Sequence, residues 1–285
     1  MALIEYTLEG KENKVETAIN RLKAFEPPEG YFLAFSGGKD SVVIKRLAEM
    51  AGVKFDAHYS VTSVDPPELV RFVKEQKDVR FDIPRDKDGN AITMWNLIPK
   101  KKMPPLRRVR YCCKELKECA GKRRLTVTGV RWAESVNRKK NGGLVKAFGS
   151  KKTVIEGVEA GGKINAKGGV ILNFDNNDAR RFVEHCYRTS NTTLNPIIDW
   201  NDEDVWEFIK TENIPYCELY DCGYKRLGCI GCPMNTNAAE GLERYPKIKA
   251  AYIRAFNRML AEREAAGLET QWNTPEDVMA WWLRE

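Results

Sequence analysis

The sequence has 285 residues, which is enough for one large domain or for a domain with an extension. Hydrophobic residues make up 42% and charged residues 31%, a composition typical of a folded, water-soluble protein. The longest apolar runs fall well short of the roughly 18 residues of a membrane-spanning helix. The N-terminus is acidic early and lacks an apolar signal segment, so a cytoplasmic location without membrane contact is predicted.

Residues 1–29 are expected to contribute an N-terminal helix that packs on a sheet. Apolar residues recur at helical spacing at Val15, Ala18, Ile19 and Leu22. Pro27, Pro28 and Gly30 then end this helix.

Residues 31–51 predict a buried strand, a tight glycine turn and a helix. Tyr31 to Phe35 is a short aromatic-rich apolar run, and SGGKDS follows it at 36–41. Val42, Val43, Leu47 and Met50 come next at the spacing of one buried helix face. The turn therefore falls at a helix N-terminus, where unpaired N–H groups and the helix dipole favour an anion.

Five of the six residues of this turn suit a phosphate group, and Asp40 is unusual in a bare anion site. Gly37 and Gly38 let the backbone approach a ligand closely, Lys39 adds a cation, and Ser36 and Ser41 add hydroxyl donors. Asp40 is expected either as a helix cap or as a ligand of a magnesium ion that bridges phosphates. The alternative is an ordinary capped turn between a strand and a helix.

Residues 53–60 alternate like a strand, and Ser60 and Thr62 come at its carboxyl end. Ligands of open α/β sheets bind at that edge. His58 lies within the strand and is expected to be packed rather than catalytic.

The stretch Lys100–Arg124 is strongly basic. It carries eleven Lys and Arg residues against Glu115 and Glu118, a local balance of +9. Such a run is either a solvated face or a contact for a polyanion, here nucleotide phosphates or a nucleic acid such as DNA or tRNA.

Residues 125–130 predict another strand, with Arg131 at its carboxyl end. The following glycine-rich and lysine-rich stretch 139–170 is expected to be an insertion that forms a small hairpin or a mobile flap. A helix with an inner face of Val205, Trp206 and Ile209 is expected after Asp199 or Asn201, which can cap it. Residues 236–285 are expected to form a helical extension.

Four cysteines form two pairs, Cys112-Cys113 and Cys229-x₂-Cys232. A CxxC on a tight Gly-containing turn has the geometry of a metal-binding knuckle. A tandem pair is a poor half-site for zinc because adjacent side chains diverge. The residues leave open an iron–sulfur cluster, zinc, or redox thiols without metal. Cys222, in a flexible-looking YDCGY loop, is the most plausible reactive thiol among the others, although a bystander role is favoured.

The motifs SGGKDS, GVRxxES and NP-x₃-W-x₂-EDVW-x₈-PY-x₂-LYD-x-GY-x₃-GC-x₂-C together resemble the phosphoadenosine phosphosulfate (PAPS) reductase family of the adenine-nucleotide α-hydrolase, or PP-loop, superfamily. The resemblance covers most of residues 30–235. It implies an α/β fold with an open, twisted, mostly parallel sheet and helices on both faces. ATP or the sulfonucleotides APS or PAPS would bind at Ser36–Ser41, with the adenine near Ser60 and Thr62.

The same resemblance implies further site residues. Arg131 and Arg138 would bind phosphate. The tandem cysteines and the CxxC resemble the four-cysteine [4Fe–4S] site of APS reductases and of DNA phosphorothioation sulfurtransferases, so Cys112, Cys113, Cys229 and Cys232 would ligate such a cluster close to the nucleotide.

One departure from the family separates the possible functions. Assimilatory reductases carry a nucleophilic cysteine in a Cys-Gly-x-His motif near the C-terminus, and no cysteine follows Cys232 here. The favoured hypothesis is therefore cleavage of ATP between the α and β phosphates, followed by sulfur transfer to DNA, tRNA or a small target from a sulfur-donor protein. Lys39, Asp40 and Arg131 would carry the catalysis. The alternatives are APS or PAPS reduction, with Cys222 or an external thiol as nucleophile, and a non-catalytic subunit that binds nucleotide and cluster.

Overall fold

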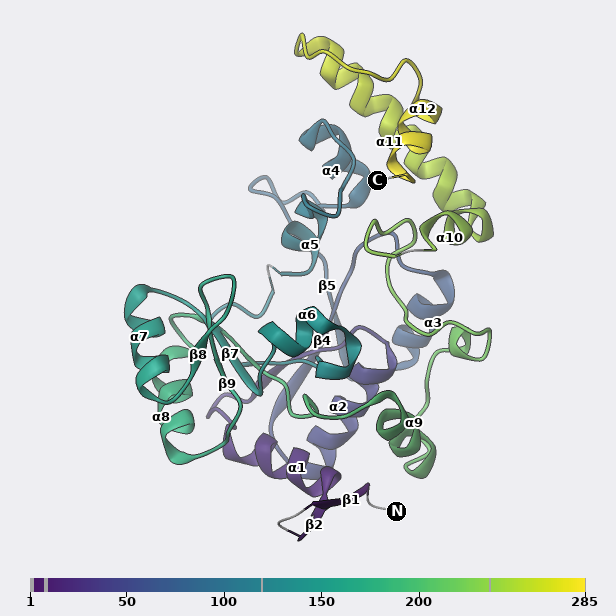
Figure 1. Cartoon of the computed structure of the whole chain (residues 1–285). Coiled ribbons are helices and arrows are strands. Elements are labelled where there is room, and N and C mark those ends of the chain that lie inside the picture. Colours follow the sequence, from purple (N-terminus) through teal and green to yellow (C-terminus); the bar gives the residue numbers. More distant parts are fainter. Residues whose placement is uncertain (1–2, 8–9, 119, 236, 285) are drawn as a thin grey trace. The chain divides into compact units, whose positions relative to one another are not determined.

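The fold was analysed in a computed structural model of the whole chain, which describes residues 3–7, 10–118, 120–235 and 237–284. Its centre is an eight-stranded sheet (Figure 1). In sheet order the strands are β5 (Val79–Asp82), β4 (Phe55–Ser60), β3 (Tyr31–Ala34), β6 (Thr126–Val127), β10 (Asn191–Leu194), β7 (Val145–Phe148), β9 (Val170–Leu172) and β8 (Lys163–Ile164).

The sheet is parallel in its centre and antiparallel on one side. Strands β4, β3, β6 and β10 pair in parallel, with Leu33 opposite both Ala57 and Val127. Strands β7, β9 and β8 continue from β10 with antiparallel pairing. The predicted α/β class with helices around a sheet is confirmed, and the sheet itself is mixed.

Two compact units divide the chain. The first unit comprises residues 1–59, 72–80 and 121–220, and the second comprises 60–71, 81–120 and 221–285. This division differs from the expected series of an N-terminal helix, one nucleotide-binding domain over 30–235 and a helical extension. The second unit gathers three separate segments because its helices share one apolar core, which no single segment could form.

The first unit contains the short hairpin of β1 (Ile4–Thr7) and β2 (Gly10–Asn13) and most of the helices beside the sheet. These helices are α1 (Lys14–Ala24), α2 (Lys39–Ala51), α6 (Val136–Asn141), α7 (Lys151–Glu159), α8 (Asn177–Cys186) and α9 (Asp202–Thr211). α3 (Pro67–Glu75) has residues in both units. Asn13 caps α1 by accepting hydrogen bonds from the N–H groups of Val15 and Glu16 at 3.1 and 3.2 Å.

Packing of the first unit agrees with most of the apolar pattern. The helix α2 buries Val42, Val43 and Leu47, whereas Met50, expected on the same face, is 38% exposed. His58 stacks on Phe32 with 4.2 Å between ring centroids, which confirms that it is a packed residue.

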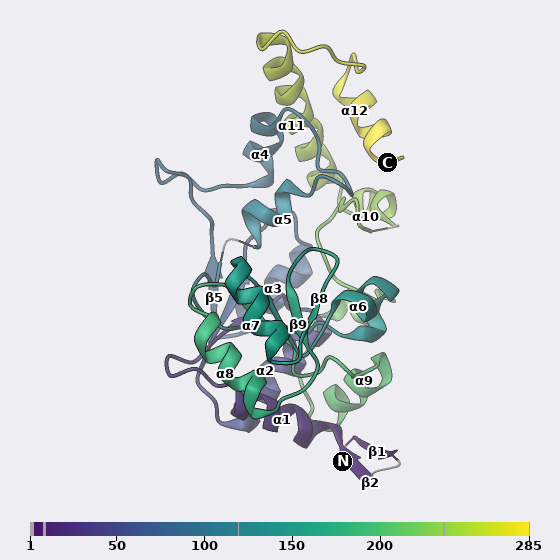
Figure 2. The ribbon, with the colours of Figure 1, turned by 60° about the vertical axis from the view of Figure 1, so that its left-hand side comes forward.

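The segment 139–170, expected as an insertion with a small hairpin or a mobile flap, is part of the sheet, and β8 pairs with β9 as a hairpin. It supplies β7, α7 and β8, and β7 pairs with both β10 and β9. Figure 1 and Figure 2 both show α7 and α8 side by side next to these strands. The glycines serve close packing here: a Cβ on Gly157 would lie 2.5 Å from Val170.

The second unit is mainly helical. Its helices are α4 (Met94–Lys101), α5 (Tyr111–Leu116), α10 (Ala238–Arg244), α11 (Pro246–Ala265) and α12 (Pro275–Trp282). Its core centres on Tyr252, Phe256 and Trp282, and α4 packs along α11. None of the helices in the described ranges is long and apolar enough to cross a membrane.

Candidate nucleotide-binding site and cysteine cluster

The SGGKDS loop joins β3 to α2, as the sequence predicted. Gly37 has a φ of +73°, a left-handed conformation that favours glycine, and Gly38 stands at the N-cap of α2. The Ser41 hydroxyl donates to the Gly38 carbonyl at 2.8 Å and also lies 3.3 Å from the Ser36 hydroxyl. Gly38 has no side chain with which to cap α2, and the first backbone N–H of the helix, that of Lys39, donates to the Tyr220 hydroxyl instead.

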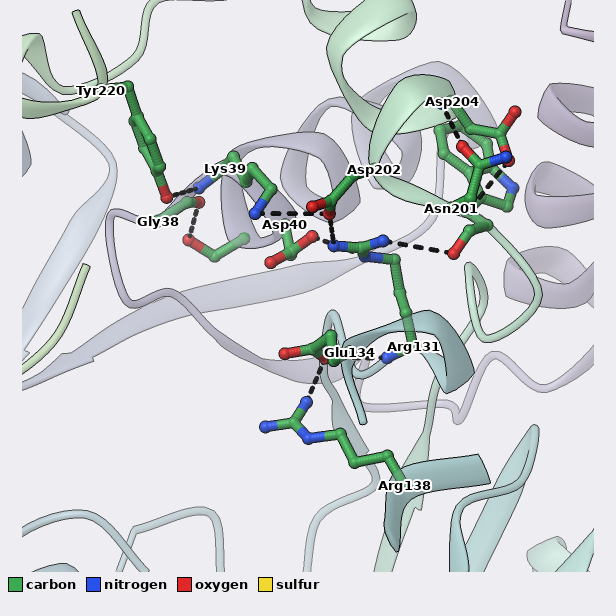
Figure 3. A network of polar contacts seen from close by, with 12 residues as sticks. Gly38, Lys39, Asp40, Arg131, Glu134, Arg138, Asn201, Asp202, Asp204 and Tyr220 are labelled. Atoms are coloured by element: carbon green, nitrogen blue, oxygen red, sulfur yellow. Dashed lines mark hydrogen bonds and ion pairs between the residues drawn. The ribbon is translucent and has the colours of Figure 1, made fainter. Parts of the chain in front are cut away.

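Lys39 is buried at the start of α2. Only 3% of the residue is exposed, and its Nζ lies 3.5 Å from Oδ1 of Asp202 (Figure 3). Its backbone N–H donates to the Tyr220 hydroxyl at 2.8 Å, and Nζ lies 5.9 Å from the centroid of the same ring. The sequence did not point to Tyr220, which ends a short turn of 3₁₀ helix, η2 (Glu218–Tyr220).

Arg131 links α2, the helix that follows the glycine loop, to α9. Its Nε donates to Oδ1 of Asp40 at 2.7 Å, its Nη2 to Oδ1 of Asp202 at 2.5 Å and its Nη1 to the Trp200 carbonyl at 3.2 Å (Figure 3). The side chain is 1% exposed. The predicted phosphate role of Arg131 stays a prediction, and a phosphate would have to exchange with one of these partners.

The charges of this network shift one another. Burial raises the pKa of Asp40 and outweighs the opposing effects of Arg131 and Lys39. Burial also acts to raise the pKa of Asp202, but hydrogen bonds and charge from Arg131 and Lys39 lower it overall. Of the two carboxylates in this network, Asp202 is therefore more firmly ionised than Asp40.

Glycine permits the close approach that the network needs. A Cβ on Gly129 would lie 2.8 Å from Cβ of Asp40 and 2.9 Å from its carbonyl oxygen. The strand end that leads to Arg131 therefore lies directly against the first turn of α2.

Arg138, the second predicted phosphate ligand, lies on α6 and pairs with Glu134. Glu134 also accepts a hydrogen bond from the Arg131 backbone N–H at 3.0 Å, so both arginines meet at this carboxylate (Figure 3). The Arg138 side chain is 36% exposed.

Ser60 ends β4, and Thr62 lies beyond it in the second unit. Thr62 is 1% exposed, accepts a hydrogen bond from the Val64 N–H at 3.2 Å and hydrogen-bonds Cys229 through its side chain. The expected adenine contacts of Ser60 and Thr62 stay predictions.

The second unit brings the two cysteine pairs into one neighbourhood. Cys112 and Cys113 occupy the first turn of α5, and Cys229 and Cys232 flank a turn closed by the Cys232 N–H donating to the Cys229 carbonyl at 3.3 Å. Gly231 has a φ of +68° in this turn, and its Cα faces the Trp282 ring, since a Cβ there would lie 2.9 Å from it. The Ile230 carbonyl accepts from the buried Tyr252 hydroxyl at 3.0 Å.

The thiols influence one another electrostatically. The hydrogen bond between the two tandem sulfurs raises the pKa of Cys112 and lowers that of Cys113 to about 6. Burial raises the pKa of Cys229 to about 12 against the opposing charge of Lys117. Charge on Cys229 also raises the pKa of Cys112, and charge on Cys232 raises that of Cys229.

This donor set fits an iron–sulfur cluster. Within the described residues, no three His, Cys, Asp or Glu side chains surround a point as the ligands of a single metal ion do. A [4Fe–4S] cluster instead takes one thiolate on each of its irons, so its four ligands stand around a larger object. Four neighbouring thiols in a largely apolar setting, with the cationic Lys117 beside them, provide that chemistry.

Cys222 is exposed, and it hydrogen-bonds the guanidinium of Arg244. Arg244 is held over the rings of Tyr224 and Tyr245 at 5.3 and 5.7 Å. Arg244 is therefore a cationic neighbour of this thiol. Cys186 and Cys217 are buried, and Cys119 lies outside the described residues.

Most basic residues of the stretch Lys100–Arg124 are exposed, but some of their side chains are paired with other groups of the protein. Lys101 pairs with Glu115 at 2.8 Å, and Arg107 donates to the Pro233 carbonyl at 2.7 Å. Arg124 belongs to the first unit and is bound to Asp56 and to the backbone carbonyls of Gly30 and Tyr31. The exposed basic residues of this stretch are Lys100, Lys101, Arg107, Arg108, Arg110, Lys114, Lys117, Lys122 and Arg123.

The sheet, the glycine loop at the start of α2 and the buried Lys39 define an α/β fold whose loop meets a helix N-terminus, a position that favours an anion. Comparison with known families then identifies the group. The phosphoadenosine phosphosulfate reductase domain matches residues 30–235. The chain belongs to this family.

Individual proteins match this chain either at low sequence identity or over a short segment. An uncharacterized protein of Methanocaldococcus jannaschii is 27% identical over 235 residues, which are 79% of this chain and 45% of that protein. An adenosine 5′-phosphosulfate reductase of Oceanobacillus iheyensis is 45% identical over 51 residues, or 18% of this chain and 21% of the enzyme. The chain thus spans less than half of each of these relatives.

Solved structures with a similar fold include a PAPS reductase from Candida auris in complex with phosphate. It is 15% identical with a TM-score of 0.45, over 76% of this chain and 87% of that enzyme. A Candida glabrata FMN adenylyltransferase matches 76% of this chain and 62% of its own, at 16% identity and a TM-score of 0.41.

Proposed function

We propose that this chain is an iron–sulfur enzyme that activates a target with ATP and transfers sulfur to it. The observation that carries the proposal is the SGGKDS loop, which places a glycine turn, the N-terminus of α2 and the buried Lys39 at the end of a parallel strand. These features suit the phosphates of an adenine nucleotide. Family membership supports the same assignment.

The chemistry divides into two balanced steps. An oxygen of the target attacks the α-phosphorus of ATP, the bond to the β-phosphate breaks, and pyrophosphate leaves with an adenylated target behind. A sulfur nucleophile delivered by a donor then displaces AMP and forms the new bond to sulfur.

Residues of the loop would stabilise the charges of the phosphates and would form no covalent bond with the nucleotide. Lys39 and the N–H groups at the start of α2 would hold the leaving pyrophosphate and the charge that develops on it. Asp40 would help to position a magnesium ion that the nucleotide brings. Arg131 would steady the phosphates through the guanidinium edge that now contacts Asp202.

The second unit would hold the cofactor. Cys112, Cys113, Cys229 and Cys232 would ligate a [4Fe–4S] cluster, and Lys117 would balance the charge of their thiolates. Such a cluster would supply an electrostatic influence on an activated sulfur or phosphorus centre without having to pass electrons.

The favoured target is a nucleic acid. The exposed lysines and arginines between Lys100 and Arg123 would neutralise phosphates of the nucleic-acid backbone. Contacts with these phosphates dominate the affinity of proteins for DNA and RNA. A salt dependence of binding, reduced when several of these lysines are replaced, would support this assignment.

The decisive experiment is a product assay with ATP, magnesium, a sulfide source and DNA or tRNA, under exclusion of oxygen. We expect equal amounts of AMP and pyrophosphate, formed only with the target present and lost in Lys39→Ala. ADP as the product, or no nucleotide cleavage with any target, would sink the proposal.

A separate measurement tests the cofactor. Protein purified without oxygen should contain about four irons and four acid-labile sulfides per chain. Cys112→Ala and Cys232→Ala should lose them, whereas Cys186→Ala, at a buried thiol of the first unit, should retain them. Zinc or no metal in the unaltered protein would refute the cluster.

A second candidate function is reduction of APS or PAPS. The names of the matching reductases favour it, although each match covers only about a fifth of the enzyme. The exposed Cys222 beside Arg244 would attack the sulfate sulfur and release AMP or its 3′-phosphate, and a thioredoxin-type dithiol would then release sulfite. Sulfite formation that disappears in Cys222→Ser would favour this function over the first.

A further inference from the structure

One carboxylate holds both cations of the nucleotide loop. Oδ1 of Asp202 lies 3.5 Å from Nζ of Lys39 and 2.5 Å from Nη2 of Arg131. Figure 3 shows the Asp202 side chain reaching from α9 to the point where these two side chains meet. The groups that would bind phosphate are therefore already paired with an oxygen anion of the protein.

Asp202 differs from Asp40 in how firmly it is fixed. The Asp40 side chain is 24% exposed and stands against Gly129 and Arg131. The Asp202 side chain is 68% exposed although its carboxylate contacts two largely buried cations. A rotation of this one side chain toward solvent would break its contacts with Lys39 and with one edge of Arg131.

The backbone of α9 does not depend on Asp202. Asn201 caps the helix by accepting from the Asp204 N–H at 2.8 Å, and the Asp204 carboxylate accepts from the Asn201 N–H at 2.8 Å. This reciprocal capping box fixes the helix start on either side of Asp202. The Asp202 side chain is thus available for another role.

The charge balance indicates what that role is. Lys39 and Arg131 carry two positive charges, and Asp40 and Asp202 carry two negative charges, so the four groups together are neutral. A phosphate that enters meets no net attraction until Asp202 leaves, after which the remaining three groups carry one positive charge. The carboxylate and a phosphate oxygen compete for the same donors.

We propose that Asp202 is a displaceable internal counter-ion that competes with the nucleotide phosphates for Lys39 and Arg131 and so sets the affinity of the loop for them. Asp202 is a positioning and affinity-determining residue and takes no part in bond making. This inference rests on the proposed nucleotide site.

The test is calorimetric titration of the full chain with sodium pyrophosphate in the presence of EDTA. Asp202→Asn keeps the size of the side chain and removes its charge. It should bind pyrophosphate about three- to tenfold more tightly than the unaltered protein, the range expected for releasing partly exposed ion pairs. Lys39→Ala in the Asp202→Asn background should abolish the gain.

Glu203→Gln is the matched control. Glu203 is the next residue of the same helix turn, is exposed, and its replacement changes the net charge and the helix-dipole interaction in the same way. It should leave pyrophosphate affinity within about twofold of the unaltered protein, because it contacts neither cation. Asp202→Glu, which keeps the charge, should resemble the unaltered protein and guards against a folding effect of the asparagine variant.

Each outcome separates this inference from the proposed function. Binding that depends on Lys39 but is not tighter in Asp202→Asn overturns the counter-ion role and leaves the nucleotide site standing. Tighter binding in Asp202→Asn without AMP formation from ATP supports the counter-ion role and removes the proposed activity. Weaker binding in Asp202→Asn that appears only with magnesium would make Asp202 a metal ligand and refute the inference, and no pyrophosphate binding by any variant would refute both.

Discussion

At the scale of single residues, Arg131 is a buried cation of the first unit that makes several polar contacts. Three acceptors from two different elements share its guanidinium, and almost none of it is exposed. Breaking a buried charge pair leaves its partner without compensation, which costs more than an exposed pair gains. The contribution of Arg131 to stability should therefore be separable from any contact with nucleotide.

Arg131→Met should destabilise the first unit by about 3 kcal/mol without nucleotide, because Asp40 keeps its buried position and loses its cation. Arg131→Lys should recover part of this loss. Thermal unfolding followed by calorimetry measures both changes.

Arg138→Met is the control for the Arg131 variants. The Arg138 side chain is 36% exposed and pairs with Glu134 four residues earlier, so its replacement should cost no more than about 1 kcal/mol. Equal destabilisation by the two methionine variants would contradict a special role of the Arg131 network.

At the scale of elements, Asp56 and Arg124 join β4 to the chain that enters β6. Nη1 of Arg124 donates to Oδ2 of Asp56 at 2.7 Å, and Nη2 donates to the Tyr31 carbonyl at 2.9 Å. The hydrogen bond from Arg124 lowers the pKa of Asp56. The folded state therefore binds fewer protons at Asp56 than the unfolded chain does.

The sign of this shift sets a pH window. The stabilisation is fully present above the unfolded pKa of about 3.9, and it is lost as the pH falls through the lower folded pKa. Asp56→Asn should lower the free energy of unfolding by about 1 kcal/mol near pH 7, and the difference should shrink below about pH 4.

Urea denaturation at a series of pH values measures the difference between Asp56→Asn and the unaltered protein. Asp88→Asn, at an exposed loop position of the second unit, should change stability by less than about 0.5 kcal/mol. A deficit for Asp56→Asn that is as large at pH 3 as at pH 7 would contradict the ion-pair explanation.

The segment 139–170 shows the effect of sheet pairing on a glycine-rich sequence. If β7 and β9 are integral strands, their amides should exchange with deuterium as slowly as those of β3. The exposed turn at Lys122 and Arg123 supplies a fast reference in the same unit. Hydrogen-exchange mass spectrometry makes the comparison, and exchange of 145–148 and 170–172 at the rate of that turn would indicate the mobile flap instead.

These elements also show what the sequence could and could not predict. The strand, turn and helix of 31–51 were predictable because their apolar spacing and glycines act locally. The sheet role of 139–170 was not, because Gly157 and Gly169 are small to admit Val170 and Phe148, and composition alone does not distinguish close packing from mobility.

The limits are similar in the candidate site. The residues of SGGKDS were identified from local chemistry, but Asp202 was not, since its partners lie 71 residues or more away in sequence. In the sequence, Asp199 or Asn201 was expected to cap α9, and that expectation gave Asp202 no role of its own. Trp206, expected on the inner face of α9, is half-buried against Tyr216 and Tyr220, and Phe208 is buried in its place.

At the scale of the whole molecule, each of the two units has its own core. The core of the second unit depends on Trp282, which is 3% exposed, donates its indole N–H to the Pro105 carbonyl at 2.6 Å and packs on Tyr252. The same ring lies against Gly231, so it also supports the turn between Cys229 and Cys232.

Trp282→Ala should therefore destabilise the second unit by about 3–5 kcal/mol, because it removes a large buried ring and leaves a cavity. Calorimetry should show a lower transition temperature for this unit, together with a lower iron content after anaerobic purification. Trp281→Ala, at a half-buried ring, should have a much smaller effect on both. Retention of iron and stability in Trp282→Ala would contradict this role for the ring.

The separation of the two cysteine pairs along the chain has a consequence for biosynthesis. Cys113 and Cys229 are 116 positions apart, and residues 121–220 between them belong to the first unit. At the usual rate of translation, the tandem thiols leave the ribosome on the order of ten seconds before the CxxC turn. During that interval Cys112 and Cys113 have no partners to share a ligand with, so any cofactor they bind must be loaded after most of the chain has been made, and a nascent chain is most exposed to oxidation at that pair.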